Sequence, residues 1–349
     1  MTTSLQYSPL GNSEVNIPSV CLGTMTFGEQ TSESDAHSQL DFAMENGVNF
    51  FDTAEMYAVP PRPETFGRSE EIVGNWLKSQ PREKVILATK VAGPSRNLDW
   101  IRGGPLALDR SNIRQAIEGS LRRLQTDYVD LYQVHWPERN QPMFGQWQFN
   151  PANDRACTSI HAQLEALAEL VKEGKIKMIG LSNEHPWGIM QFIRIADELG
   201  LPHIVSTQNA YSLLNRNFET GLAEVCHHEK VGLLAYSPLA FGHLSGKYLK
   251  DSNAPGRLTQ WPNFGQRYEK PNVAPAVRAY AALAEKYKLS LTELALGFVH
   301  SRWFVSSTII GASSLTQLRE TLPANYTQMS TELLSEIDAI HLQFTNPAP

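Results

Sequence analysis

The chain has few cysteines, no long apolar run and no excess of positive charge. Its three cysteines, Cys21, Cys157 and Cys226, are widely spaced among 349 residues, which excludes a disulfide framework and a Cys-x-x-Cys metal or redox motif. The sequence contains no run of about 18 apolar residues, so it predicts no membrane-spanning helix. Residues 1–18 contain no basic region followed by an apolar one, so they do not indicate a secretory signal. A net charge of −6 offers no basic surface to nucleic acid or anionic lipid. We therefore expect a cytoplasmic protein that neither binds nucleic acid nor inserts into a membrane.

The sequence also lacks the usual nucleotide and metal motifs. No Gly-x-Gly-x-x-Gly occurs, so dinucleotide binding of the Rossmann kind is not expected. The segment 242–248 is similar to a P-loop, but only three residues separate its glycines and Tyr248 stands where Ser or Thr would hold magnesium. His227 and His228 point about 100° apart on a helix and have no suitably spaced third ligand. We expect no metal site.

What the chain does contain is a regular alternation of apolar runs and amphipathic segments. Each apolar run is typical of a buried strand, and each following segment has apolar residues at three- and four-residue spacings. The eight predicted strand and helix pairs are 19–23 with 34–46, 48–51 with 69–78, 85–89 with 111–124, 129–134 with 159–173, 176–181 with 187–199, 204–207 with 217–229, 232–236 with 274–287, and 305–310 with 314–322.

This alternation predicts a parallel sheet covered by helices. The predicted fold class is α/β, and a closed (β/α)8 TIM barrel over residues 1–349, as a single domain, fits eight units best. We also expect an N-terminal β-hairpin around Gly11, and two extra helices at about 290–301 and 330–342. The alternative is a doubly wound open sheet with a second domain, although no linker-like change in composition divides the chain.

Titratable side chains follow three consecutive strands of the predicted barrel. Asp52 and Tyr57 follow the run 48–51, Lys90 ends the next run, and His135 ends the one after that. The carboxyl ends of neighbouring barrel strands share one face, so we expect the four side chains to converge. Lys90 would lower the pKa of Tyr57 from about 10, and Asp52 would keep the lysine charged. Taken singly, each residue more often has a structural role. A tyrosine at such a position usually packs in the core, a lysine is usually solvated, and an aspartate can cap a turn.

The stretch 47–57, GVNFFDTAEMY, resembles the most specific signature of the aldo-keto reductase superfamily, in the branch of Tas-type bacterial reductases and potassium-channel β subunits. The resemblance extends from Gly23 to nearly the C-terminus. It implies that the four titratable residues form a catalytic tetrad, with Tyr57 as proton donor and a nicotinamide as hydride source. His135 would orient the carbonyl oxygen.

The resemblance further implies an NADP(H) site. Residues at the ends of strands five and six would bind the nicotinamide carboxamide, and the ring of Tyr236 would lie under the nicotinamide as an aromatic shelf. The loop after Tyr236 would bind the pyrophosphate. The implied cofactor ligands are Gly23, Thr24, Met25, Gln30, Asp52, Ser182, Asn183, Gln208, Tyr236, Ser237, Pro238, Leu239, Gly242, Lys247, Arg257, Gly311, Ser313, Gln317 and Glu320.

The expected preference for NADP(H) over NAD(H) rests on the residues that would meet a 2′-phosphate. Lys247 and Arg257 would neutralise phosphates, and the N–H groups of Gly311 to Ser313, before a helix, face an anion favourably. Ser313, Gln317 and Arg257 would accommodate a 2′-phosphate. The alternative is an ordinary loop and a solvated arginine.

Three features depart from the family pattern. Thr321 stands where relatives commonly have Asn, and Met25 stands where many have Trp. The segment 58–66 exceeds the usual length and is expected to narrow or cover the pocket. Four tryptophans in loops on the same side either form an apolar substrate cage or pack among the loops: Trp100, Trp136, Trp147 and Trp261.

We therefore expect an NADP(H)-dependent oxidoreductase that reduces an aldehyde or ketone to an alcohol, or catalyses the reverse. Its partner would be a small-molecule carbonyl or alcohol, and the sequence predicts no oligomeric state. One alternative is an NADP(H)-binding, redox-sensing regulatory subunit that contacts a membrane protein, although channel β subunits carry Asn where His135 stands. Another is an unrelated barrel lyase or isomerase, which would bind no nicotinamide.

Overall fold

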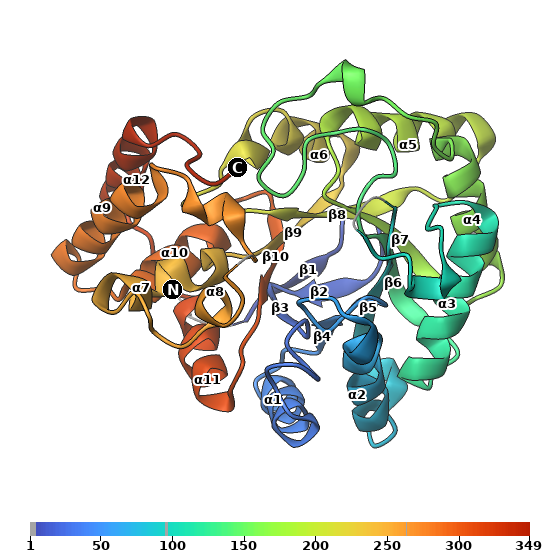
Figure 1. Cartoon of the computed structure of the whole chain (residues 1–349), viewed down its shortest axis with the longest axis horizontal. Helices are drawn as coiled ribbons and strands as arrows, with labels where there is room; N and C mark the ends of the chain where they lie inside the picture. The colour runs from blue at the N-terminus through green and yellow to red at the C-terminus, as the bar shows by residue number, and fades with distance from the viewer. Residues whose placement is uncertain (1–4, 95–96, 263) are drawn as a thin grey trace.

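Within residues 5–94, 97–262 and 264–349, which the computed structural model describes, eight parallel strands form a closed barrel (Figure 1). The strands are β3 (Val20–Gly23), β4 (Phe50–Asp52), β5 (Ile86–Val91), β6 (Val129–Val134), β7 (Ile176–Ser182), β8 (Ile204–Ala210), β9 (Gly232–Tyr236) and β10 (Val305–Ile310). Each pairs with its neighbour in sequence, and β10 closes on β3 with Thr308 opposite Val20. The predicted (β/α)8 barrel is confirmed, and the doubly wound alternative is wrong because the sheet has no open edge.

Helices surround this barrel (Figure 1). Those after the strands are α1 (Glu33–Glu45), α2 (Arg68–Leu77), α3 (Arg110–Leu124), α4 (Ile160–Lys172), α5 (Pro186–Leu199), α6 (Leu222–Glu229), α9 (Val273–Lys286) and α11 (Leu315–Ala324). The two extra helices are α10 (Leu291–His300) and α12 (Thr331–Gln343). The predicted helix 217–229 is divided into a 3-10 turn and α6, because Gly221 between them has a φ of 96°.

An antiparallel hairpin closes the amino-terminal end of the barrel. It consists of β1 (Tyr7–Pro9) and β2 (Asn16–Pro18). Leu10 and Ile17 are fully buried and pack against inward-facing residues of the strands, among them Phe50 and Leu131. The opposite end, where the strands finish, is therefore the end open to function.

The loop after β9 crosses this open end and contains short elements that the sequence did not predict. They are a 3-10 segment (Ala240–Ser245), α7 (Lys247–Lys250), α8 (Arg257–Gln260) and a 3-10 turn (Gln266–Glu269). Segments of four to six residues are too short to show a helical period. None of the helices in the described ranges is long and apolar enough to cross a membrane.

Candidate active site

The carboxyl ends of β4 and β5 bring Asp52, Tyr57 and Lys90 together. The fully buried Lys90 ammonium donates hydrogen bonds to Asp52 Oδ2 at 2.6 Å and to the Thr53 carbonyl at 2.8 Å. It also lies 3.4 Å from the Tyr57 hydroxyl. A buried charge is tolerated only with such partners. The three residues therefore form one electrostatic unit.

His135, directly after β6, packs its ring against the ring of Tyr57. The two ring centroids are 5.7 Å apart and the rings are nearly perpendicular, at 77°. Both side chains are largely buried. The structure thus brings together all four titratable residues that the sequence placed on one face.

The electrostatics of Tyr57 differ from the expectation. Burial raises the pKa of Tyr57, the Lys90 cation lowers it only in part, and Asp52 raises it further, so the pKa lies above its ordinary value. Burial lowers the pKa of Lys90, but Asp52 and Tyr57 outweigh burial and raise it overall. The prediction of a lowered Tyr57 pKa is wrong because the cost of burying a phenolate exceeds the attraction of one lysine. Tyr57 is consequently a protonated donor at neutral pH, beside a charged lysine.

Two amides hold the second oxygen of Asp52. Gln133 Nε2 donates to Asp52 Oδ1 at 3.0 Å, and Gln208 Nε2 donates to the same atom at 2.9 Å. Sequence reasoning missed Gln133, which is fully buried on β6. An amide within an otherwise apolar strand was the available signal, because such a group needs a buried partner.

Replacing Gln133 by leucine should lower the free energy of unfolding by about 1–3 kcal/mol, because Asp52 Oδ1 loses one of two donors while it stays buried. Urea denaturation measures the change. Gln115→Leu, at an exposed position on α3, is the matched control and should stay within about 0.5 kcal/mol of wild type. Equal effects of the two substitutions would contradict this role of Gln133.

The ends of β7, β8 and β9 place polar side chains beside the tetrad. Asn183 Nδ2 donates to the His135 carbonyl at 2.9 Å, and the Tyr236 hydroxyl donates to Asn183 Oδ1 at 2.7 Å. Ser182 Oγ donates to the Gln208 carbonyl at 2.8 Å. The predicted carboxamide ligands and aromatic shelf therefore form one hydrogen-bonded group with His135.

Lys247 and Arg257, in the loop after β9, form no ion pair with a carboxylate of the described residues. Lys247 Nζ donates to the Pro255 carbonyl at 2.9 Å, and a Cβ atom on Gly256 would lie only 2.2 Å from Nζ. Arg257 Nε is buried and has no hydrogen-bond partner among the described residues. Burial lowers the pKa of both cations, and Arg257 lowers that of Lys247 further. Such a group fits a ligand with negative charge, as the phosphates of NADP(H) carry.

Four more of the predicted cofactor ligands differ in how their side chains are bonded and buried. Ser313 donates from N and Oγ to Gln317 Oε1 at 3.0 and 3.1 Å, before α11, and Gln30 Nε2 is buried without a partner in the described residues. The Thr24 side chain is occupied within the fold, since it bonds to the Asp52 carbonyl at 3.1 Å and to Ser69 Oγ at 2.7 Å. Ser313 and Gln317 therefore lie near the surface, whereas Gln30 Nε2 and the Thr24 side chain are buried.

An apolar cluster lines the side of the mouth around Tyr57. It includes Trp136, with Met25 and Trp100 partly buried at its edge. The long segment 58–66 joins this cluster, because Val59 is buried in it and donates from N to the Met25 carbonyl at 2.9 Å. Trp147, by contrast, is 69% exposed and lies outside the cluster.

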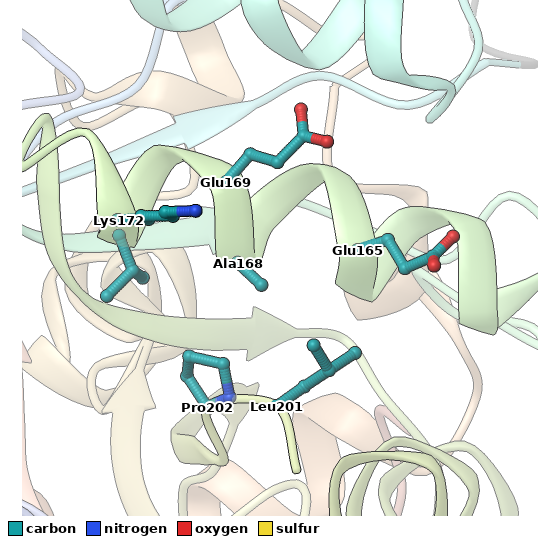
Figure 2. Close-up of a pocket in the computed structure, with 7 residues that line it drawn as sticks. Glu165, Ala168, Glu169, Lys172, Leu201 and Pro202 are labelled. Carbon is teal, nitrogen blue, oxygen red and sulfur yellow. The ribbon is translucent and has the colours of Figure 1, made fainter. Parts of the chain in front are cut away.

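A groove of about 400 Å³ lies away from this site, between α4 and the turn before β8 (Figure 2). Its lining is mainly apolar, with Ala168, Leu201 and Pro202, and Glu165 and Glu169 rise from α4 beside it. Glu165 Oε1 lies 3.3 Å from His161 Nε2, and Glu169 forms an ion pair with Arg110. Lys172 also lines the groove and is exposed to solvent. The groove therefore lacks the buried, hydrogen-bonded arrangement found around Tyr57. In the described part of the chain, no cluster of three His, Cys, Asp or Glu side chains is arranged to hold a metal.

Comparisons with known proteins agree with this geometry. The Aldo/keto reductase family profile matches residues 19–342. The chain is 49% identical to Protein tas of Escherichia coli (strain K12), over 99% of this chain and 100% of that protein. It is 41% identical to an aldo-keto reductase of Babesia bovis over 76% of this chain and 98% of the relative, and 32% identical to the uncharacterized oxidoreductase YrpG of Bacillus subtilis over 96% of each. The chain therefore belongs to the aldo/keto reductase family of oxidoreductases.

Proposed function

We propose that this oxidoreductase reduces small aldehydes or ketones to alcohols with NADPH, or catalyses the reverse reaction with NADP⁺. The observation that carries this proposal is the Tyr57 hydroxyl, 3.4 Å from a Lys90 ammonium that is itself paired with Asp52. We further propose a cytoplasmic location, which the three free thiols support.

In this proposal each member of the site has a separate task. NADPH supplies the hydride when it is bound. Tyr57 gives its proton to the developing alkoxide, and Lys90 stabilises the phenolate that remains. Asp52 keeps Lys90 charged and fixed in position. His135 donates a hydrogen bond that orients the substrate carbonyl.

The proposed cofactor site follows the polar rim of the barrel. Ser182, Asn183 and Gln208 would hold the nicotinamide carboxamide, above the Tyr236 ring. Lys247 and Arg257 would neutralise phosphates, and this role is supported because neither has a carboxylate partner among the described residues. Ser313 and Gln317, before the N-terminus of α11, would meet the 2′-phosphate.

Arg257→Met should raise the Kd for NADPH about 10- to 100-fold, because a charged hydrogen bond to phosphate contributes about 1.5–3 kcal/mol. Titration of NADPH fluorescence measures the change. Arg278→Met, on the exposed face of α9, is the control and should bind like wild type. Equal affinities of the parent protein for NADPH and NADH would reject the preference for NADP(H).

Turnover separates the reductase from its alternative. In the presence of the wild-type protein, some members of a panel of aldehydes, ketones and quinones should oxidise NADPH. The decrease in NADPH absorbance measures this turnover. Tight NADPH binding with negligible turnover on every carbonyl, together with co-purification of a membrane protein, would instead favour a redox-sensing regulatory subunit.

A further inference from the structure

Arg267 lies on the 3-10 turn Gln266–Glu269, in the loop after β9. This part of the loop contacts the loop after β6 at the open end of the barrel. A Cβ atom on Gly145, in the β6 loop, would lie 2.9 Å from the Cβ of Arg267. Lys270 Nζ donates to the Gly145 carbonyl at 2.7 Å and fixes the same contact. The guanidinium itself lies beside the phenols of Tyr236, at the end of β9, and Tyr268, which places it at the carboxyl end of the strands.

No ion pair among the described residues includes Arg267, which is only partly exposed. Burial lowers its pKa, but the phenols of Tyr236 and Tyr268 beside it outweigh burial and raise the pKa overall. The pKa of Lys270 is lowered by burial and by Arg267. Two neighbouring cations at a mouth without a counter-charge attract an anion.

The surroundings of Arg267 associate it with the reacting end of the site. Arg267 lies beside Tyr236, the Tyr236 hydroxyl bonds to Asn183, and Asn183 bonds to the carbonyl of His135. Lys247 and Arg257 already supply positive charge for the cofactor phosphates. Arg267 is thus a cation at the nicotinamide end, where a substrate would lie.

We propose that Arg267 binds a carboxylate of the substrate, so that the preferred substrates are aldehydes or ketones with a carboxylate a few atoms from the carbonyl. This inference rests on the proposed function. The planar guanidinium fork matches the two carboxylate oxygens. The apolar cluster with Trp136 and Met25 contacts the hydrocarbon part between the two polar ends.

The test compares 4-carboxybenzaldehyde with its neutral ester, methyl 4-formylbenzoate, under NADPH. Wild type should prefer the acid in kcat/KM, and Arg267→Met should reduce the acid-to-ester ratio about 10- to 100-fold, mainly through KM. The Kd for NADPH should not change. Arg267→Lys keeps the charge without the fork and should give an intermediate ratio; it also serves if Arg267→Met does not fold. Arg278→Met should match wild type.

Several results would overturn the inference. Equal kcat/KM for acid and ester in wild type would reject the carboxylate subsite while leaving the reductase intact. A weaker Kd for NADPH in Arg267→Met, with an unchanged acid-to-ester ratio, would make Arg267 a cofactor ligand. If neither aldehyde is reduced, calorimetry of benzoate with the protein and NADP⁺ decides: weaker binding in Arg267→Met supports the subsite, and equal binding rejects it.

Discussion

Tyr57→Phe should lower kcat for carbonyl reduction by about 10²- to 10⁴-fold, the usual contribution of a positioned general acid. The substitution removes only the hydroxyl. The ring keeps its edge contact with His135, and the Lys90 ammonium, 4.8 Å from the ring centroid, keeps its bonds to Asp52 and Thr53. The loss should therefore be catalytic and not structural.

Two measurements isolate the effect of Tyr57. The Kd for NADPH and the unfolding midpoint should stay close to wild type, while steady-state turnover of a reactive aldehyde falls. Tyr128→Phe removes the hydroxyl from a ring that packs against Arg82 and Lys177 at the far end of the barrel, and should keep wild-type turnover. Near-normal turnover in Tyr57→Phe would eliminate this residue as the proton donor.

Lys90→Met should destabilise the fold by about 3–5 kcal/mol, because it leaves the Asp52 carboxylate buried without its cation. Asp52 is 2% exposed, and Lys90 is fully buried. Turnover should also fall, since Lys90 is the cation that counteracts the raised pKa of Tyr57. Urea denaturation gives the stability, and NADPH oxidation by the folded fraction gives the rate.

An exposed lysine provides the comparison for Lys90. Lys177 pairs with Asp130 at 2.8 Å but is about half exposed, so Lys177→Met should cost about 1 kcal/mol or less. The double variant Asp52→Leu and Lys90→Met should recover part of the lost stability, because no charge is left buried alone. Similar losses of unfolding free energy for Lys90→Met and Lys177→Met would show that burial does not increase the contribution of the Lys90–Asp52 ion pair to stability.

Most of the barrel is predictable from the sequence, because each strand is an apolar run and each long helix has a clear period. The short helices between Ala240 and Glu269 are not predictable in this way, because tertiary contacts, and not a local sequence pattern, stabilise helices of about four residues. The convergence of Asp52, Tyr57 and Lys90 follows from barrel topology alone.

Other parts of the site depend on contacts between distant segments. Gln133 has a role in the site because it donates a hydrogen bond to Asp52, 81 positions earlier in the chain. Arg267 reaches the site because its loop lies at the open end of the barrel. The direction of the Tyr57 pKa shift was wrongly predicted, because the depth of burial is a property of the folded packing. The contact of the Thr24 hydroxyl with Ser69 likewise joins two segments that are distant in the chain.

Isotope transfer tests direct carbonyl reduction at this site most sharply. Wild-type protein would be incubated with methyl 4-formylbenzoate and NADPH carrying deuterium on either face of the nicotinamide C4, and the alcohol analysed by mass spectrometry. We expect deuterium on the carbinol carbon from one of the two labelled cofactors only, and little labelled alcohol from Tyr57→Phe in the same time. A carbinol hydrogen derived from solvent, or equal product from the variant, would contradict hydride transfer with Tyr57 as the acid.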